Sequence, residues 1–312
     1  MKDLPLMKIY DTIIIGSGAA GLSAAIYASR AALEYIVIEK NYMGTGQIAE
    51  SERVDNYPGL YGENGFELGE KFRSHAEALG TSFIEGEVTE IVPDNGLYRI
   101  SLEDGSSYMT KTVIYAAGAS HRKLGIKGEA EFAGKGVSYC AVCDGAFYKN
   151  KTAAVIGGGD TALGEAIFLS KIAEKVYLIH RRDAFRGNKT LSKQIMETEN
   201  IEIIYNAVPV EISGEKRVEN LRISQNGEER VIPVNGVFAA IGNAPDSALL
   251  DGIAELDGNG YVIAGEDCIT SAKGIFAAGD VRTKPLRQVV TAAADGANSV
   301  YSAEKYLSEK GE

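Results

Sequence analysis

The stretch that decides the fold of this chain is Asp11-Thr12-Ile13-Ile14-Ile15-Gly16-Ser17-Gly18-Ala19-Ala20-Gly21. A short apolar run rich in β-branched residues ends in a glycine turn, and the turn opens an alanine-rich segment. A strand, a glycine turn and a helix in this order place a diphosphate against the N-terminus of the helix. The chain repeats the pattern about 140 residues later, in Thr152-Ala153-Ala154-Val155-Ile156 followed by Gly157-Gly158-Gly159-Asp160-Thr161-Ala162.

The two copies differ at the position that meets the ribose of a dinucleotide. Counting 23 residues from the first glycine gives Glu39 in the first copy and His180, followed by Arg181 and Arg182, in the second. A carboxylate there accepts hydrogen bonds from ribose hydroxyls, whereas a basic cluster pairs with a 2′-phosphate. The sequence therefore predicts two bound dinucleotides, one without a 2′-phosphate and one with it. The alternative interpretation is ordinary tight turns and a solvated charge cluster.

The strands that close the two copies define the domain organisation. Residues 112–118 and 236–242 each form an apolar strand that ends in glycine, and residues 274–280 form a third such strand without a duplicate. The simplest assembly returns this tail, with its final helix, to the first domain. We therefore expect an α/β fold of two Rossmann-like, three-layer domains, the first discontinuous (residues 1–118 and 247–312) and the second spanning 119–246. A two-stranded hinge is expected near residues 117–120 and 244–247.

Composition bounds the class of protein and its surroundings. The net charge is −11, which argues against binding to nucleic acids or to anionic membranes. The uncharged stretch 12–29 contains glycines and serines at turn positions, so we do not interpret it as a membrane span. The first ten residues lack the basic and apolar regions of a secretory signal, and three cysteines are too few for a disulfide scaffold. We expect a cytoplasmic protein.

Cys140-Ala141-Val142-Cys143 lies inside the expected second domain and allows three interpretations. Zinc would need about four ligands, and Cys268 is the one remaining cysteine, so no metal is expected. Two structural thiols are possible, but the CxxC spacing beside two dinucleotide sites favours a redox dithiol. Asp144 follows directly, where its carboxyl would give a proton to a departing thiolate or would cap the next helix.

Taken together, these motifs closely resemble the bacterial-type, low-molecular-weight thioredoxin reductases, which are class II pyridine nucleotide-disulfide oxidoreductases. The likeness runs from Thr12 to about Leu307. Its matching pieces are 16–21, 140–145, 157–162, 180–186, 279–281 and 287–288. The resemblance implies FAD in the first domain, NADPH in the second, a homodimer, and an enzyme that passes electrons from NADPH through FAD to Cys140 and Cys143 and on to thioredoxin. It also implies that Cys143 is nearer the flavin and that the domains rotate about the hinge.

The candidate site residues follow from the motifs and from this resemblance. For FAD they are Gly16, Ser17, Gly18, Ala19, Ala20, Glu39, Lys40, Gly46, Gln47, Asn56, Val88, Ala117, Gly118, Gly279, Asp280, Arg287, Gln288 and Val289. For NADPH they are Gly157, Gly159, Asp160, Thr161, Ala162, His180, Arg181, Arg182, Arg186, Ile241 and Gly242. Cys140, Cys143 and Asp144 are the candidate catalytic residues. Gly164 departs from the family, where this position is often acidic.

Two alternative functions remain open on the sequence. A thioredoxin reductase fed by ferredoxin would share the flavin site and the dithiol, but such relatives lose the second phosphate-binding motif. A flavin-binding redox sensor would signal through Cys140 and Cys143 without turnover, and an intact NADPH site would then serve no purpose.

Overall fold

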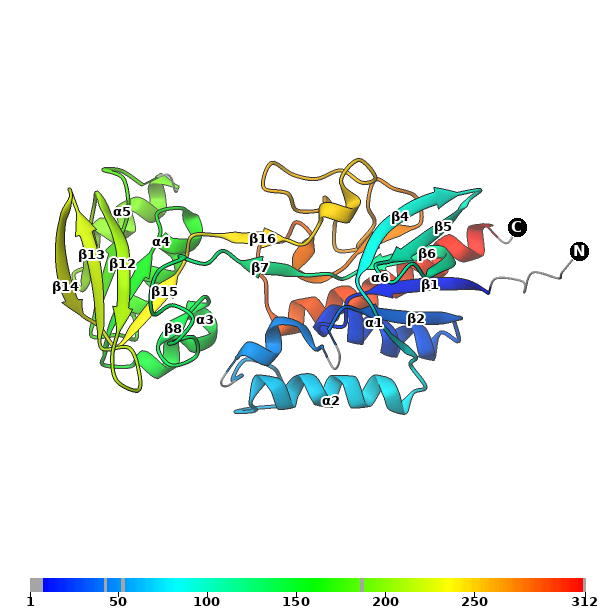
Figure 1. The fold of residues 1–312 in the computed structure, drawn as a ribbon, viewed down its shortest axis with the longest axis horizontal. Helices are drawn as coiled ribbons and strands as arrows, with labels where there is room; N and C mark the ends of the chain where they lie inside the picture. Colours follow the sequence, from blue (N-terminus) through cyan, green and yellow to red (C-terminus); the bar gives the residue numbers. More distant parts are fainter. Residues whose placement is uncertain (1–7, 42–43, 52–53, 186–187, 311–312) are drawn as a thin grey trace, which may run out of the picture. The chain divides into compact units, whose positions relative to one another are not determined.

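The computed structural model describes residues 8–41, 44–51, 54–185 and 188–310. By its internal contacts the chain divides into two compact units: Met1–Glu50, Tyr57–Ser120 and Ala244–Glu312 form unit 1, and Ser51–Asn56 and His121–Asn243 form unit 2. Two short strands, β7 (Ala119–His121) and β16 (Asn243–Pro245), pair with each other where the chain passes from one unit to the other (Figure 1).

Unit 1 is built on a seven-stranded sheet with the order β3-β2-β1-β6-β5-β4, in which β17 also pairs with β6. Strands β1, β2, β3, β6 and β17 run parallel, and β4 and β5 extend the sheet antiparallel from β6. The strands are β1 (Ile9–Ile15), β2 (Tyr35–Glu39), β3 (Phe83–Glu85), β4 (Val88–Asp94), β5 (Leu97–Leu102), β6 (Ser107–Tyr115) and β17 (Ile275–Ala277). Its helices are α1 (Ala19–Arg30), α2 (Gly65–Ala78) and α6 (Val289–Lys310), with 3-10 turns η1 (Gly46–Glu50), η3 (Ala248–Leu250) and η4 (Gly279–Val281).

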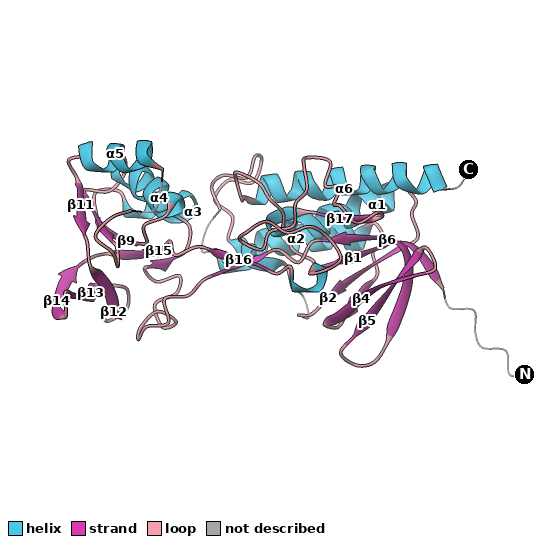
Figure 2. Ribbon diagram, turned by 90° about the horizontal axis from the view of Figure 1, so that it is seen from above, coloured by secondary structure: helices cyan, strands magenta, loops and turns pink. Residues whose placement is uncertain are grey.

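Alternation along the strands of unit 1 gives the sheet two buried faces. Ile14 packs with α1 and α6 residues such as Leu22 and Val300, whereas Ile13 and Ile15 face a second cluster that includes Ile100 of β5. Because both faces of the sheet are covered, the sequence of β1 ends in a continuous apolar run rather than an alternation of apolar and polar residues. Figure 2 shows the helices on one side of the sheet and the β4–β5 hairpin on the other.

Unit 2 repeats this plan with a smaller parallel sheet of order β11-β10-β9-β15-β8. Its strands are β8 (Val137–Ser138), β9 (Thr152–Ile156), β10 (Lys175–Ile179), β11 (Ile201–Ile204) and β15 (Gly236–Ala239). The helices α3 (Ala141–Asp144), α4 (Asp160–Ser170) and α5 (Lys189–Glu197) accompany it, with the 3-10 turn η2 (Gly145–Tyr148). The strands β12 (Ala207–Ser213), β13 (Asn220–Gln225) and β14 (Glu228–Pro233) form a separate antiparallel meander.

The core of unit 2 is again split by the sheet. Val155 packs with α4 residues such as Leu163, while Ala154 and Ile156 face the meander through residues such as Leu221. Each unit thus has a helical layer, a parallel sheet and an antiparallel layer, which agrees with the three-layer α/β architecture predicted from the sequence.

One predicted element differs from the observed strands. The sequence analysis places a strand at residues 112–118, but in the structure the nine-residue strand β6 begins at Ser107 and ends at Tyr115. The polar residues in its middle satisfy their hydroxyls locally: Thr110 Oγ1 donates to the carbonyl of Thr112 at 2.8 Å, and Thr112 Oγ1 donates to the carbonyl of Asp11 at 2.7 Å. Buried threonines with hydrogen bonds do not interrupt a strand.

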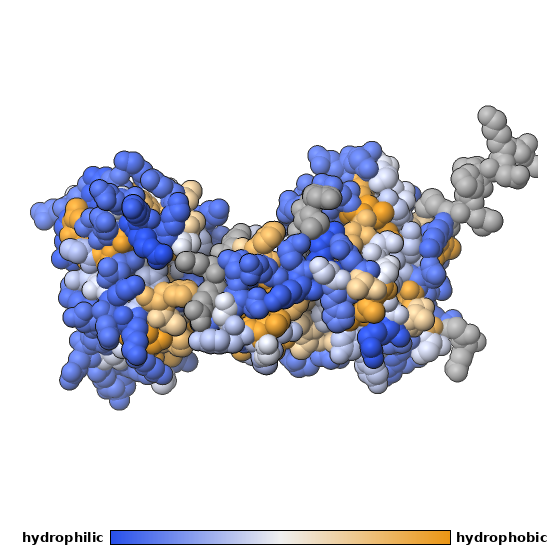
Figure 3. Space-filling view, turned by 90° about the horizontal axis from the view of Figure 1, so that it is seen from below, coloured by the Kyte–Doolittle hydropathy of each residue, from blue (hydrophilic) through white to orange (hydrophobic). Residues whose placement is uncertain are grey.

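On the face drawn in Figure 3, hydrophobic side chains form small groups among hydrophilic ones. No helix within the described ranges is both long enough and apolar enough to cross a membrane. The same residues contain no cluster of three or more His, Cys, Asp or Glu side chains that would hold a metal ion.

Candidate active site

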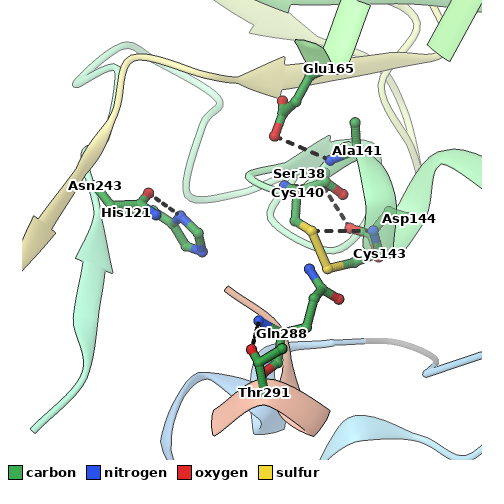
Figure 4. Close-up of a disulfide and its surroundings, with 10 residues drawn as sticks. All are labelled: His121, Ser138, Cys140, Ala141, Cys143, Asp144, Glu165, Asn243, Gln288 and Thr291. Carbon is green, nitrogen blue, oxygen red and sulfur yellow. Dashed lines mark hydrogen bonds between the residues drawn. A yellow bond between two sulfur atoms is a disulfide. The ribbon is translucent and has the colours of Figure 1, made fainter. Parts of the chain in front are cut away.

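Cys140 and Cys143 form a disulfide at the start of α3, with their Cα atoms 5.3 Å apart. Cys140 is the N-cap residue of this one-turn helix, and its Sγ accepts a hydrogen bond from the backbone N–H of Cys143 at 3.2 Å (Figure 4). Both cysteines are half-buried and the intervening Val142 is exposed. A partly accessible disulfide whose sulfur receives a backbone N–H has the properties of a redox-active pair, because the N–H stabilises the thiolate that forms on reduction.

Ser138 connects the two ends of the disulfide turn. Its hydroxyl donates to Asp144 Oδ2 at 2.6 Å and accepts from the backbone N–H of Cys140 at 3.1 Å. The alternative role considered for Asp144 was capping the following helix, but its side chain makes no capping hydrogen bond to η2. The carboxyl is instead oriented within the disulfide turn by Ser138.

Glu165, on α4, is a second carboxyl at the disulfide and was not among the residues predicted from the sequence. Its Oε1 accepts the backbone N–H of Ala141 at 3.4 Å (Figure 4). Burial raises the pKa of Glu165 to about 7; the Ala141 N–H lowers it and the charge of Asp144 raises it further. The available sequence signal was an acid within the apolar part of this helix, between Leu163 and Ala166.

The first dinucleotide motif lies at the carboxyl edge of the parallel sheet of unit 1. Gly16 follows β1, Glu39 ends β2, and the predicted residues 117–118 and 279–280 follow β6 and β17. Gly16 has φ +98°, and a Cβ atom there would lie 2.5 Å from the carbonyl oxygen of Ala116, so the turn requires glycine. The parallel register therefore gathers four separate segments of the sequence at one edge, as in other sheets of this type.

The Glu39 carboxylate is held in a defined orientation at this edge. Ser17 donates to Glu39 Oε2 twice, from its backbone N–H at 2.8 Å and from its hydroxyl at 2.9 Å. Asn41 N–H donates to the other oxygen at 3.0 Å. The carboxylate is half-buried, and Oε1, which accepts one hydrogen bond, retains capacity to accept another. This arrangement fits the predicted role of Glu39 toward ribose hydroxyls.

The remaining candidates for the first cofactor lie in several environments. The side chain of Gln47 donates to the carbonyl of Ala119, the exposed Lys40 pairs with Asp246 at 3.4 Å, and Val88 is buried in the core. Asn56 is exposed and is grouped with unit 2 rather than with the other candidates. Arg287 lies over the ring of Tyr261, 4.0 Å from its centroid, and Gln288 and Val289 lead into α6.

A buried ionic network supports the Gly279–Asp280 turn and was also missed. Asp295 of α6 accepts the backbone N–H of Gly279 at 2.9 Å, two bonds from Arg282 at 2.8 and 2.7 Å, and one from Lys284 at 2.7 Å. The side chains of Arg282, Lys284 and Asp295 are 2, 3 and 2% exposed. The sequence did not reveal this network because its members are spread over two elements and look like ordinary surface charges.

The second dinucleotide motif occupies the corresponding edge of unit 2. Gly157 follows β9, His180 follows β10, and the predicted Ile241 and Gly242 follow β15. A Cβ atom at Gly158 would lie 2.1 Å from His180 Nδ1, so this glycine allows the imidazole to pack against the turn. Asp160 and Thr161 are exposed at the start of α4, and Ala162 is buried below them.

The basic residues of unit 2, His180, Arg181 and Arg182, differ in burial, which the sequence did not indicate. His180 is 6% exposed, and its Nε2 lies 3.0 Å from the carbonyl oxygen of Ala184. Burial lowers the pKa of His180, and the charges of Arg181 and Arg182 lower it further. The two arginines are exposed, so they rather than the histidine carry the positive charge. The predicted Arg186 lies outside the described residues.

Both glycine turns fit a diphosphate. The N-caps of α1 and α4 are Gly18 and Gly159, and neither helix has a side chain that caps its first N–H groups. A Cβ atom at Gly159 would meet no protein atom within 4 Å, which leaves the space over the helix end open. Uncapped N–H groups at a helix N-terminus are donors for phosphate oxygens.

Comparison with known proteins gives consistent results. The family model described as pyridine nucleotide-disulphide oxidoreductase matches residues 10–296. A thioredoxin reductase of Listeria monocytogenes is 42% identical over 97% of this chain and 95% of that protein, and one of Bacillus subtilis is 41% identical over 97 and 96%. The crystal structure of thioredoxin reductase from Streptococcus pyogenes is 39% identical, with a TM-score of 0.91 over 96% of this chain and 99% of that one.

The match extends over nearly the full length on both sides, so it covers both dinucleotide motifs and the disulfide between them. The resemblance expected from the sequence is thereby confirmed, and the protein is an oxidoreductase. The chain belongs to the pyridine nucleotide-disulphide oxidoreductase family, within its group of thioredoxin reductases.

Proposed function

We propose that this protein is an NADPH-dependent thioredoxin reductase, which passes electrons from NADPH through FAD to the Cys140–Cys143 disulfide and on to thioredoxin. The observation that carries the proposal is the disulfide at the start of α3, which lies in the same unit as a dinucleotide turn followed by two exposed arginines. Relatives named thioredoxin reductase at 41 to 43% identity support the substrate class.

Membership of the family implies a flavin and a nicotinamide cofactor. In this proposal the FAD is held by the turn at Gly16–Ala20, by Glu39 and by the Gly279–Asp280 turn. The NADPH is held by the turn at Gly157–Ala162 and by Arg181 and Arg182, whose guanidinium groups pair well with a 2′-phosphate. When bound, the two cofactors supply hydride and electron transfer.

The chain's own residues then handle the sulfur chemistry. Reduction breaks the S–S bond and leaves a thiol and a thiolate. Asp144, oriented by Ser138, gives a proton to the sulfur of Cys143, so that Cys140 remains the thiolate. The Cys143 N–H stabilises negative charge on Cys140, which then attacks the disulfide of the substrate. Cys143 completes the exchange by attacking Cys140 and releasing the reduced substrate.

Two further properties belong to the same proposal. A homodimer follows from the family likeness and is testable by light scattering of the purified protein. A cytoplasmic location follows from the chemistry, because a dithiol that must be regenerated for turnover works in a reducing compartment.

The decisive experiment is an anaerobic titration of the yellow protein with NADPH and, separately, with NADH. We expect NADPH to bleach the flavin at low concentration and oxidised thioredoxin to restore the colour. Bleaching by reduced ferredoxin but not by NADPH would support the ferredoxin-fed alternative. Bleaching without turnover on any disulfide substrate would support a redox sensor.

A further inference from the structure

Glu165 is a half-buried acid placed directly against the redox disulfide turn. It projects from α4 toward the first turn of α3, where Oε1 accepts the N–H of Ala141, the residue that follows Cys140 (Figure 4). Its Oε2 is buried and has no hydrogen-bond partner among the described residues. A carboxylate with one unsatisfied oxygen is costly inside a protein, so neutralisation of this group is favoured.

The charges around Glu165 make its protonation depend on the disulfide. The elements packed against α4 are α3, η2, β9, β10 and α5. Their charged residues are Asp144 of α3, Lys175 of β10, and Lys189, Lys193 and Glu197 of α5. Among these, the charge of Asp144 raises the pKa of Glu165. Burial together with Asp144 raises the pKa of Glu165 to about 7, so small changes in local charge alter its state at neutral pH. A thiolate on Cys140 would add such a charge at the same turn.

We propose that Glu165 is a positioning residue for the thiol chemistry, which takes up a proton when the disulfide is reduced and releases it when the Cys140 thiolate is consumed. The inference rests on the proposed reductase function. Reduction by NADPH breaks the S–S bond with two electrons; one proton goes to the sulfur of Cys143, and Cys140 remains a thiolate. Glu165 takes the second proton from solvent, so the net charge at the turn stays constant.

Oxidation reverses this balance. The Cys140 thiolate attacks the substrate disulfide, and Cys143 then closes the internal S–S bond. The two electrons leave with the substrate as two thiols, which carry away the proton from Cys143 and the proton from Glu165. An ionised Glu165 would repel the thiolate, because like charges in a partly buried site disfavour each other.

The test measures Cys140 alkylation by iodoacetamide in the chemically reduced, flavin-loaded protein across pH 5.5 to 9, with the modified residue identified by mass spectrometry. Glu165→Gln is the key variant, because glutamine mimics the protonated acid at every pH. We expect equal rates for the variant and the wild type near pH 6. Near pH 8 the variant should react about two- to fivefold faster, as expected when ionised Glu165 raises the pKa of a partly ionised thiol by about one unit.

The matched control is Glu197→Gln, an exposed glutamate of α5 in the same unit, which pairs with Lys193 at 3.6 Å. It should follow the wild-type profile throughout. A ratio of Glu165→Gln to wild type that stays constant with pH would overturn the inference. Thioredoxin is absent from this assay, so the result does not depend on whether thioredoxin is the substrate.

A second measurement covers the case in which Glu165→Gln does not fold. The double variant Cys143→Ser, Asp144→Asn has Cys140 as a free thiol and Glu165 as the carboxyl that remains beside it. A two-step pH profile of Cys140 alkylation is expected from coupled ionisations. A single-step profile would contradict the proposed role of Glu165.

Discussion

Replacing Asp295 by asparagine should destabilise unit 1 strongly. Asp295 accepts four hydrogen bonds, three of them from Arg282 and Lys284, whose side chains are 2 and 3% exposed. The variant keeps the shape of the side chain but leaves two buried cations without their counter-ion. Removing one partner of a buried ion pair costs about 3–5 kcal/mol. The partly solvated Glu266, 3.2 Å from Arg282, does not replace the lost charge because it is 83% exposed.

A double-mutant cycle separates this ionic effect from a simple packing effect. Arg282→Met alone should lower the free energy of unfolding less than Asp295→Asn does, because Asp295 keeps Lys284 as a partner. The double variant should be more stable than the sum of the single losses predicts, by about 0.5–3 kcal/mol, because methionine removes the orphaned guanidinium. Since the chain has two units, a single two-state fit is not appropriate.

The assay therefore compares urea midpoints followed by flavin fluorescence, which reports on unit 1, with midpoints followed by circular dichroism, which reports on the whole chain. Asp295→Asn should lower the flavin midpoint. It should also weaken flavin binding, because the N–H of Gly279 loses its acceptor. A wild-type midpoint for Asp295→Asn, or strictly additive losses in the cycle, would refute the reasoning.

Three further predictions concern unit 2. Arg181→Ala should raise the KM for NADPH about ten- to a hundredfold and leave NADH use unchanged, and equal effects on both cofactors would contradict the phosphate assignment. Gly159→Ala should keep the melting temperature but weaken NADPH binding measured by calorimetry, whereas Gly157→Ala should destabilise the fold, since its Cβ would lie 2.4 Å from the carbonyl of Ala240. In urea titrations, Glu165→Gln should stabilise the protein by at most about 3 kcal/mol at pH 8 and not at all near pH 4. Glu165 loses its proton near pH 7 in the folded state but near pH 4.5 in the unfolded state, so wild-type stability falls as the pH rises between these values, and glutamine removes this loss. A pH-independent effect would be inconsistent with a raised pKa.

The sequence by itself predicted two dinucleotide-type turns and the ligands that we propose for them. Strand, glycine turn and helix are adjacent in the chain, and the ribose position lies a fixed distance further on, so Glu39 and Arg181 were predictable from local order alone. The Cys140–Cys143 pair was equally visible, because two residues between cysteines suffice to define a small ring.

Only the tertiary structure decided which acids and bases act on these motifs. Glu165 meets Ala141, and Asp295 meets Gly279, across turns formed by separate segments of the chain. His180 looked like part of a basic cluster, but burial against Gly158 lowers its pKa and leaves the charge to the arginines. Burial and long-range contact set these properties, and both depend on packing between elements that local sequence does not encode.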